Sequence, residues 1–325
     1  MRPLAAVVPA VLVALAAAAL LAGCGGLTSS GPPAKAGSLA QQVNLEGQSY
    51  TVGGKLADEQ QVLCQIAIAV LESVNATATD QCSVGGTDAT RQALLGGDID
   101  LYWEYTGTAW VTFLGRKPIQ DSKAQYEAVK QQDLIHNNIV WLAPTPFNNT
   151  YAFAIKAERA QQLGLRKLSD MAAYIRSGQP GNLCIEPEYQ NRDDGFPGLQ
   201  RSYGFEVPAG RLKVLQAGPI YQAIADQKEC LFGEVYTTDG RIPDLGLTVL
   251  ADDQSYHPLY NAAPILRKQI YDRNPNMAKA FAPISAALTN EVMAELNRQR
   301  SAEGRSPRRV ARDWLGQHGF IANGS

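Results

Sequence analysis

Tyrosine dominates the aromatic side chains of this sequence, which holds 13 Tyr against 8 Phe and 4 Trp. Several tyrosine rings facing one another can hold a quaternary ammonium, which donates no hydrogen bond but is attracted by ring faces at about 0.5–2 kcal/mol each. The ring hydroxyl lets neighbouring groups fix each ring in place. The tyrosines in or near segments that we expect to face a cleft are Tyr102, Tyr105, Tyr151, Tyr221, Tyr236, Tyr256 and Tyr260. Packing at the surface would explain the same positions, so both interpretations stay open at this point.

Signatures of several enzyme classes are missing from the sequence. There is no G-x-S-x-G elbow and no H-E-x-x-H helix, which disfavours an α/β-hydrolase and a zinc protease. Gly53-Gly54-Lys55 resembles the end of a phosphate loop, but Ser49 and Leu56 stand where that loop needs Gly and Ser/Thr. The three histidines lie far apart and no C-x-x-C occurs, so we expect neither a metal site nor a cofactor.

A group of acids offers the main catalytic alternative. Asp98, Asp100 and Glu104 could form a carboxylate cluster of an extracytoplasmic enzyme, although no spacing supports a glycosidase-like pair. The alternative is that these acids lie at strand ends that face water and have no catalytic role. The enzyme interpretation requires two carboxylates that face each other in a cleft, and we expect no enzymatic activity.

The N-terminus reads as an export signal. After Arg2, an apolar run of Ala5–Ala22 ends in Leu21-Ala22-Gly23-Cys24, a lipoprotein-type cleavage site. We therefore predict a signal peptide over residues 1–23 and a lipid on Cys24, which would anchor the protein to the outer face of the cytoplasmic membrane. A plain transmembrane anchor is the alternative, although the run is barely long enough to span a bilayer. Residues 24–47, which begin rich in Gly, Ser and Pro, are predicted to form a flexible tether.

Four cysteines remain once Cys24 is assigned to lipid, and an even number in an exported chain suggests disulfides. Three pairings can be drawn. We favour Cys64–Cys82 and Cys184–Cys230, because each pair then closes within one of the lobes proposed below. Four buried free thiols are the alternative.

The overall composition is that of a globular protein, with 45% hydrophobic and 18% charged residues and a formal net charge of −2. No block of Lys and Arg with interleaved aromatic residues occurs, so nucleic acid is not an expected partner.

Short apolar segments alternate with helical patterns, and glycines lie at the joints, which is typical of an α/β fold. We expect strands at 49–52, 82–84, 98–102, 140–143, 150–155, 184–186, 231–236 and 248–250. We expect helices at 58–73, 121–137, 157–162, 169–176, 195–203 and 219–226, a short one from Thr87 or Asp88 to Leu95, and a helical tail over 274–320.

Two proline-marked segments divide the chain. Pro144 and Pro146 mark a first crossing between lobes, and Pro258–Ala263 marks a return. We therefore predict a lobe I of residues 48–147 plus 258–325 and a lobe II of residues 148–257. Such an arrangement leaves a ligand cleft between lobes that hinge motion can close.

Several motifs in order along residues 48–320 resemble the substrate-binding proteins of osmoprotectant ABC importers for glycine betaine, choline and carnitine. One such motif would be weak evidence, but the set in register is specific. The motifs are GGT at 85–87, GDIDLYWEYTGT at 97–108, PFNNTYA at 146–152, NRDDG at 191–195, YQA at 221–223, TTDGRI at 237–242 and PLY at 258–260.

The resemblance implies a two-lobed type II periplasmic-binding-protein fold, a quaternary ammonium ligand and an ABC permease as partner. Matched position by position, it implies a ligand cage of Tyr105, Tyr151, Tyr236 and Tyr260. It also implies that Arg192 meets a ligand carboxylate and that Lys55 reaches the ligand from the loop before the first helix. Thr108 stands where relatives with Asp bind a choline hydroxyl, and Thr fits a broader or betaine-like set of ligands.

The sequence departs from the family at the rim of this expected site. Relatives read Ser-Lys-x-Phe-Thr-Glu-Gln where this chain reads GKLADEQ over 54–60, so an aromatic is lost and a hydroxyl becomes an acid. Trp103 replaces a usual proline, with Trp110 close by. A polyol, an amino acid or an aromatic compound therefore remains an alternative ligand for the same receptor fold. A structural envelope lipoprotein without a small ligand is a further alternative.

Overall fold

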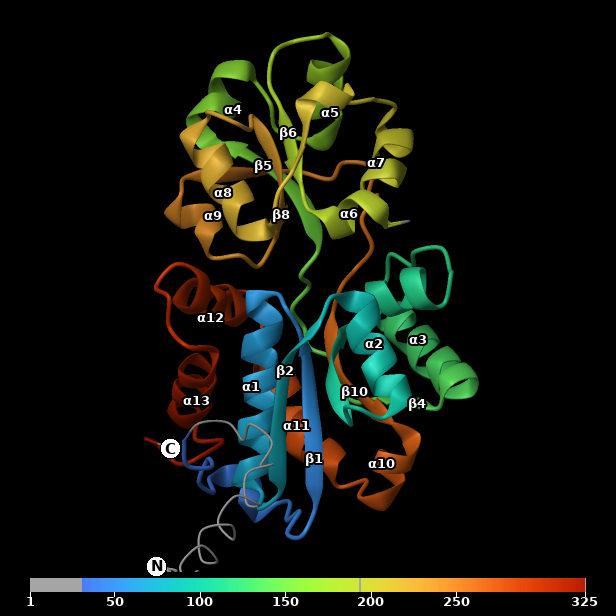
Figure 1. Cartoon of the computed structure of the whole chain (residues 1–325), viewed down its shortest axis with the longest axis vertical. Helices are drawn as coiled ribbons and strands as arrows, with labels where there is room; N and C mark the ends of the chain where they lie inside the picture. The colour runs from blue at the N-terminus through green and yellow to red at the C-terminus, as the bar shows by residue number, and fades with distance from the viewer. Residues whose placement is uncertain (1–30, 193, 325) are drawn as a thin grey trace, which may run out of the picture.

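The computed structural model describes residues 31–192 and 194–324, so Cys24 and the predicted signal peptide lie outside the described residues. Two lobes lie along the long axis of the molecule, each built on one five-stranded sheet with helices packed against it (Figure 1). The predicted α/β class with two lobes is confirmed. Within the described ranges, no helix has the length and apolar character needed to cross a membrane.

The sheet of lobe I has the order β2-β1-β3-β10-β4, with β1, β2 and β3 parallel and β10 antiparallel to both of its neighbours. Its strands are β1 (Ser49–Lys55), β2 (Thr77–Gly85), β3 (Leu101–Tyr105), β4 (Ile139–Trp141) and β10 (Ala262–Arg267). Its helices are η1 (Ser38–Gln41), α1 (Asp58–Ser73), α2 (Thr87–Gly96), η2 (Thr108–Phe113), α3 (Ser122–Asn137), α10 (Lys268–Arg273), α11 (Met277–Ala287), α12 (Asn290–Ser301) and α13 (Pro307–Gln317).

The sheet of lobe II has the order β7-β6-β8-β5-β9, and β5 runs antiparallel to both β8 and β9. Its strands are β5 (Tyr151–Lys156), β6 (Leu183–Ile185), β7 (Leu212–Val214), β8 (Phe232–Tyr236) and β9 (Leu247–Leu250). Its helices are α4 (Ala157–Leu163), α5 (Leu168–Arg176), α6 (Pro187–Asn191), α7 (Phe196–Tyr203), η3 (Ala209–Arg211), α8 (Ala217–Asp226) and α9 (Arg241–Asp244).

The two sheets are joined by the chain at residues 142–150 and 251–261, which lie side by side. An isolated antiparallel bridge pairs Asn148 with Asn261, and the Tyr260 N–H donates to Asn148 Oδ1 at 2.6 Å. Both segments carry the prolines noted in the sequence. Within the described ranges, these two segments are the only connections between the sheets. A rotation of one lobe relative to the other would therefore occur at them, as at a hinge.

Helix α1 matches its predicted bounds and brings polar residues to the space between the lobes. Its acidic first turn, with Asp58 and Glu59, suits the positive end of the helix dipole. The helix is buried on nearly all sides because it packs between β1 and β2 and the C-terminal helices α12 and α13. Tertiary contacts therefore fix the direction in which Glu59 points.

Helix α2 ends as predicted, but it begins differently. Gly97 takes the left-handed conformation, with φ of 94°, that closes a helix C-terminus. No side chain caps the N-terminus, where the sequence suggests Thr87 or Asp88. The Thr87 hydroxyl instead donates to Glu188 of lobe II at 2.6 Å. The residue therefore serves a contact between lobes rather than its own helix.

Strand β3 lies three residues later than the sequence predicts. The Asp100 carboxylate accepts the Thr51 N–H at 2.8 Å and pairs with Arg267 at 2.6 Å, so it anchors the strand's entry rather than lying within it. Residues Leu101–Glu104 are then buried on both faces, as expected for a central strand. The alternation over 98–102 was therefore misleading. The shift places Tyr105 at the end of the strand, beside the cleft.

Residues 34–47 differ from the predicted flexible tether. Ala34, Leu39, Val43 and Leu45 are buried in the lobe I core, and the segment includes the short helix η1. Ala36 also forms an antiparallel bridge with Ile321. The apolar side chains scattered among the polar ones explain why this stretch packs instead of remaining solvated.

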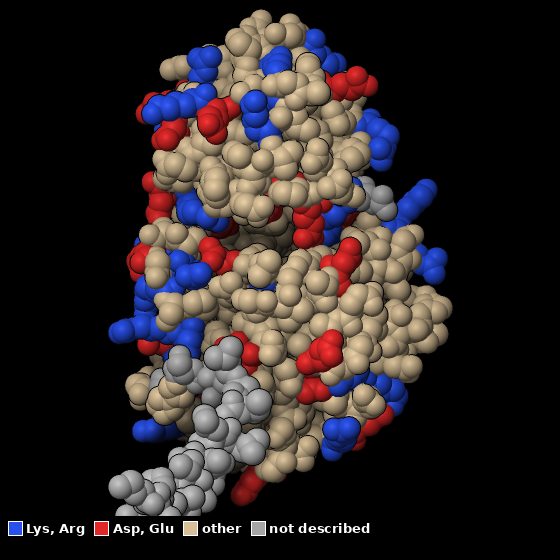
Figure 2. All heavy atoms as spheres, viewed as in Figure 1, with Lys and Arg blue, Asp and Glu red and all other residues tan. Residues whose placement is uncertain are grey.

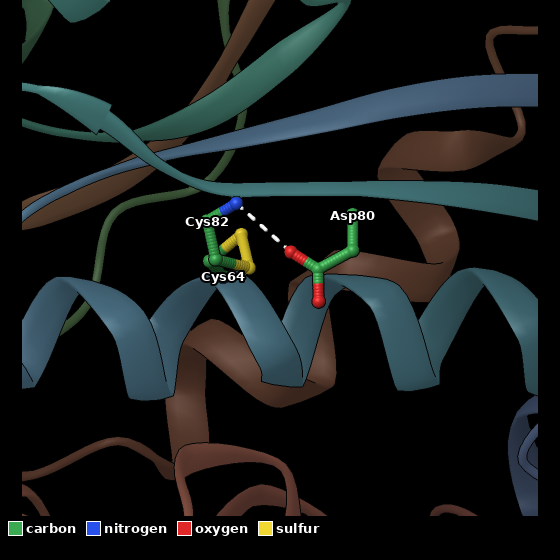
Figure 3. A group of neighbouring side chains, drawn as sticks. All are labelled: Cys64, Asp80 and Cys82. Atoms are coloured by element: carbon green, nitrogen blue, oxygen red, sulfur yellow. Dashed lines mark hydrogen bonds between the residues drawn. A yellow bond between two sulfur atoms is a disulfide. The ribbon is translucent and has the colours of Figure 1, made fainter. Parts of the chain in front are cut away.

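The two favoured disulfides are confirmed. Cys64–Cys82 joins α1 to β2, and Cys184–Cys230 joins β6 to the residues before β8, with Cα–Cα distances of 5.6 and 5.8 Å. Figure 3 shows Asp80 beside the first bond, where its carboxylate accepts the Cys82 N–H at 2.9 Å. Because both sulfurs are in a disulfide, this group of side chains offers no thiolate to a metal ion.

The disulfides should contribute unequally to stability. Cys184–Cys230 closes 46 residues and Cys64–Cys82 closes 18, so the loop-entropy relation gives about 4 and about 3 kcal/mol. We expect the Cys184→Ala/Cys230→Ala variant to lose more unfolding free energy in urea than Cys64→Ala/Cys82→Ala. A reversed order would show that local packing, not loop length, decides their contributions.

Candidate functional site

A cavity of about 480 Å³ lies between the lobes, and the space-filling view shows the hollow there with acidic and basic atoms at its rim (Figure 2). It is lined from both lobes and from the crossing segments. All seven residues that the sequence predicts to contact a ligand line this cavity: Lys55, Tyr105, Thr108, Tyr151, Arg192, Tyr236 and Tyr260.

Three of the predicted cage rings are in direct contact. Tyr151, at the start of β5, lies 5.2 Å from Tyr236 and 5.5 Å from Tyr260 between ring centroids. Tyr151 and Tyr236 are directly paired across β5 and β8, which explains their contact. Tyr105 reaches the same cluster from the end of β3 in lobe I. A fifth ring, Tyr189 of α6, packs 4.7 Å behind Tyr151, and the sequence analysis missed it.

The hydroxyls of three cage tyrosines each donate to a carboxylate. Tyr105 donates to Glu59 at 2.6 Å, Tyr236 to Glu186 at 2.5 Å, and Tyr260 to Asp194 at 2.6 Å. Among the residues that the structure describes, no carboxylate accepts from Tyr151. Sequence reasoning missed all three acids as site residues, although Asp194 lies in the NRDDG motif and Glu59 follows Lys55 closely.

Glu59 connects the lobes. Its carboxylate is buried and accepts hydrogen bonds from Tyr105, from Asn149 at 2.8 Å, from Thr238 at 2.6 Å and from Asn297 at 2.7 Å. These donors belong to β3, the first crossing segment, lobe II and α12. Burial raises the pKa of Glu59, and the four donors oppose that shift. Four donors to one carboxylate suit its ionised form, and Glu59 has no ion-pair partner in the described part of the chain.

The guanidinium donors of Arg192 are bound to acidic side chains. Its Nε and Nη2 atoms donate to the two oxygens of Asp194 at 2.7 Å each, and Nη1 donates to Glu188 at 3.0 Å. A bidentate pair of this kind is both strong and directional. The role predicted for Arg192, contact with a ligand carboxylate, stays a prediction. A ligand anion would have to share donors that these acids already occupy.

Lys55 and Thr108 lie on the lobe I side of the cavity. Lys55, the last residue of β1, pairs with buried Glu104 at 2.7 Å and lies 5.3 Å from the Tyr105 ring centroid. Thr108 begins the π-helical turn η2, a local irregularity often found at functional sites. Both side chains are almost fully buried.

The catalytic acid cluster considered above does not form. Asp100 pairs with Arg267, and Glu104 pairs with Lys55 and accepts from Tyr102 at 2.8 Å. Asp98 is exposed. None of the three lines the cavity among the described residues. Each has a structural partner or faces water, so these three acids form no opposed pair of carboxylates in the cavity.

The lobe II wall is acidic. Glu186 precedes α6, and its N–H donates to Glu234 of β8 at 2.7 Å. Burial raises the pKa of Glu186, and repulsion from Glu188 adds to that shift. Burial and repulsion from Glu186 raise the pKa of Glu234, whose side chain lies inside the lobe. The helix α6 itself was missed, although Pro187 at its first position is a known start signal.

The charges that line the cavity favour a cation. Each of the following basic residues of the cavity forms an ion pair with an acid: Lys55 with Glu104, Arg192 with Asp194 and Arg241 with Asp239. Glu59 and Glu186 form no ion pair within the described residues, so in their ionised form they add negative charge beside the tyrosine rings that no base offsets. Ring faces and unpaired carboxylates both attract positive charge.

The sequence of this chain is similar to those of known proteins. Residues 48–317 match the family described as the substrate binding domain of ABC-type glycine betaine transport system. A glycine-betaine-binding protein of Pseudomonas aeruginosa is 35% identical over 285 residues, covering 86% of this chain and 91% of that protein. The ergothioneine transport permease/ergothioneine binding protein EgtU of Helicobacter pylori is 33% identical, covering 85% of this chain and 49% of that protein.

A solved structure agrees with these sequence matches. The crystal structure of a glycine betaine/carnitine/choline ABC transporter protein is 25% identical, with a TM-score of 0.69, and it covers 83% of this chain and 99% of that chain. The similarity therefore extends over nearly the whole folded part of the molecule rather than one lobe.

The Arg192–Asp194 pair should make stability depend on acid pH. Burial alone would raise the pKa of Asp194, but the hydrogen bonds and charge of Arg192 outweigh it and hold that pKa below its usual 3.8. A lowered folded pKa stabilises the fold above the usual value, and this stability is lost as the pH falls through the folded pKa. We therefore expect Asp194→Asn to cost about 3 kcal/mol at pH 7, and less as the pH falls below 3.8.

Urea unfolding of both proteins from pH 7 to pH 3 measures this difference. Asp272→Asn removes an exposed carboxylate paired with Lys268 and serves as the control, with an expected loss below about 0.5 kcal/mol. A loss for Asp194→Asn that stays constant across the range would contradict the assigned role of the pair.

Proposed function

Because the chain belongs to the family of substrate-binding domains of ABC-type glycine betaine transport systems, we propose that it captures a quaternary ammonium solute in its tyrosine cage and delivers it to an ABC permease. Binding makes and breaks no covalent bond, and the family consists of transport proteins rather than enzymes. The observation that carries the proposal is the meeting of four predicted tyrosines in one interlobe cavity with surplus negative charge.

The cage suits a methylated ammonium group for a physical reason. Such a group presents only C–H bonds, so it gains from ring faces and from diffuse negative potential rather than from hydrogen bonds. Tyr151, Tyr236 and Tyr260 supply adjoining faces, and Tyr105 approaches from lobe I. We infer that the ammonium end of the solute lies among these rings. Arg192 and Lys55 remain the candidates for a carboxylate end, if the ligand has one.

Hinge closure would hold the solute. The contacts of Glu59 with Thr238 and of Thr87 with Glu188 join residues of lobe I to residues of lobe II around the cavity. Opening along the two crossing segments would break these hydrogen bonds and expose the cage. The solute is then bound when the lobes are together and released when the permease draws them apart.

The place of action follows from the family, because substrate-binding proteins of ABC importers work outside the cytoplasm. Two disulfides fit an oxidising compartment. We further propose that a lipid on Cys24 anchors the protein at the outer face of the cytoplasmic membrane. The folded segment from residue 34 onward would leave a short tether between the lipid and lobe I.

A bulkier ligand with the same cationic end is the second candidate. The cavity of about 480 Å³ offers room beyond a trimethylammonium group, and one relative is named for ergothioneine, a trimethylated amino acid with a ring. The loss of an aromatic residue at Ala57, an exposed residue that lines the cavity beside exposed Leu56, is consistent with a wider entrance.

Calorimetric titration with glycine betaine, choline, carnitine and ergothioneine tests the proposal. We expect at least one of them to bind, and replacement of the central ring in Tyr151→Ala to weaken that ligand by about 2 kcal/mol, close to thirtyfold. Tyr271→Ala, on α10 outside the cavity, is the control and should bind like the unaltered protein. No binding of any ligand in the panel would rule out this ligand class.

A further inference from the structure

The carboxylates behind the cage carry an inference that rests on the proposed function. We propose that Glu59, Glu186 and Asp194 are positioning residues that act through the tyrosines they hold, and that they set the cage's affinity for positive charge. The three acids come from different parts of the chain, namely α1, the start of α6 and the loop before α7. Each accepts a hydrogen bond from the hydroxyl of a different cage ring.

The geometry is that of charge-assisted hydrogen bonds. The three oxygen–oxygen distances of 2.6, 2.5 and 2.6 Å fall in the short range expected when the acceptor is ionised. A phenol that donates to an anion gains negative charge on its ring, because its O–H bond is polarised. The ring face then attracts a cation more strongly than the face of a free tyrosine or a phenylalanine.

Glu59 and Asp194 are themselves held in place, which keeps their rings in position before a ligand arrives. Glu59 accepts hydrogen bonds from Asn149, Thr238 and Asn297. Asp194 accepts from Nε and Nη2 of Arg192. A site whose supporting groups are already ordered loses less entropy on binding. Each tyrosine remains a neutral donor, since burial and the neighbouring carboxylates raise the pKa of Tyr105, Tyr236 and Tyr260 well above the usual value.

Two residues of the cavity provide internal controls for this inference. Tyr151 lies in the middle of the cage, yet no carboxylate of the described residues accepts from its hydroxyl. Glu188 lies on the same wall as Glu186 and carries the same charge, but it accepts from Thr87 and Arg192 rather than from a tyrosine. These two residues separate an effect transmitted through a ring from a general effect of negative charge in the cavity.

A double-mutant cycle on Glu186 and Tyr236 tests the inference, with tetramethylammonium as the probe because it has no polar end. Glu186→Gln keeps an acceptor oxygen but removes the charge, and Tyr236→Phe keeps the ring but removes the donor. We expect each single variant to weaken binding about tenfold at pH 8. The double variant should bind the probe no more than about twentyfold more weakly than the unaltered protein, because both changes remove the same hydrogen bond.

The matched control cycle combines Glu188→Gln with Tyr236→Phe. We expect the effects on tetramethylammonium affinity to multiply in this pair, since the hydrogen bonds of Glu188 come from Thr87 and Arg192 and not from Tyr236. Losses that multiply to about a hundredfold in the Glu186 cycle would overturn the inference, because the acid would then act on the cation directly. Singles that bind like the unaltered protein would overturn it too.

A single-variant comparison covers the case in which Glu186→Gln does not fold, as judged by circular dichroism. Tyr236→Phe should weaken tetramethylammonium at least fivefold more than Tyr151→Phe, and equal losses would overturn the inference. Failure of the proposed function is distinguishable from these outcomes. In that case the unaltered protein binds no quaternary ammonium at all, whereas the inference alone fails when that protein binds but the variants follow the wrong pattern.

Discussion

A single buried carboxylate, that of Glu59, brings together the parts of the chain that enclose the cavity. It accepts from Tyr105 of β3, Asn149 of the first crossing segment, Thr238 of lobe II and Asn297 of α12. An unpaired buried charge is costly unless donors surround it. The lobes must therefore meet at this point to supply those donors, and the meeting encloses the cage. The position of one side chain thus connects the closure of the molecule with the construction of its site.

Charged side chains elsewhere on the cavity wall are also partnered. Bases that could draw in an anion are neutralised by acids next to them, as Arg192 is by Asp194. Acids that lack such a base, such as Glu186, are joined instead to tyrosine hydroxyls. The cavity is consequently more negative than its list of residue types suggests. Under the proposed function, such a wall would favour a ligand that carries positive charge.

Local sequence signals succeeded or failed for identifiable reasons. Helix α1 was predicted to the residue because its apolar pattern and acidic first turn lie within one segment. Strand β3 was misplaced because Asp98 and Asp100 imitate the alternation of an exposed strand, whereas the true strand is buried on both faces and shows none. Residues 34–47 looked like a tether because their few apolar residues are spaced widely, and only the surface of lobe I gives those residues somewhere to pack.

The sequence by itself determined the fold class, the four tyrosines that meet in the interlobe cavity and the favoured cysteine pairing. Motifs in a fixed order specify such features, and the disulfides follow once the lobes are assigned. Only the tertiary structure decided which acids hold the rings and which groups occupy Arg192. Those partners join positions far apart in the chain, such as Glu59 with residues 179 and 238 positions further on. No local pattern encodes a contact of that range, because it exists only when both lobes are folded and packed against each other.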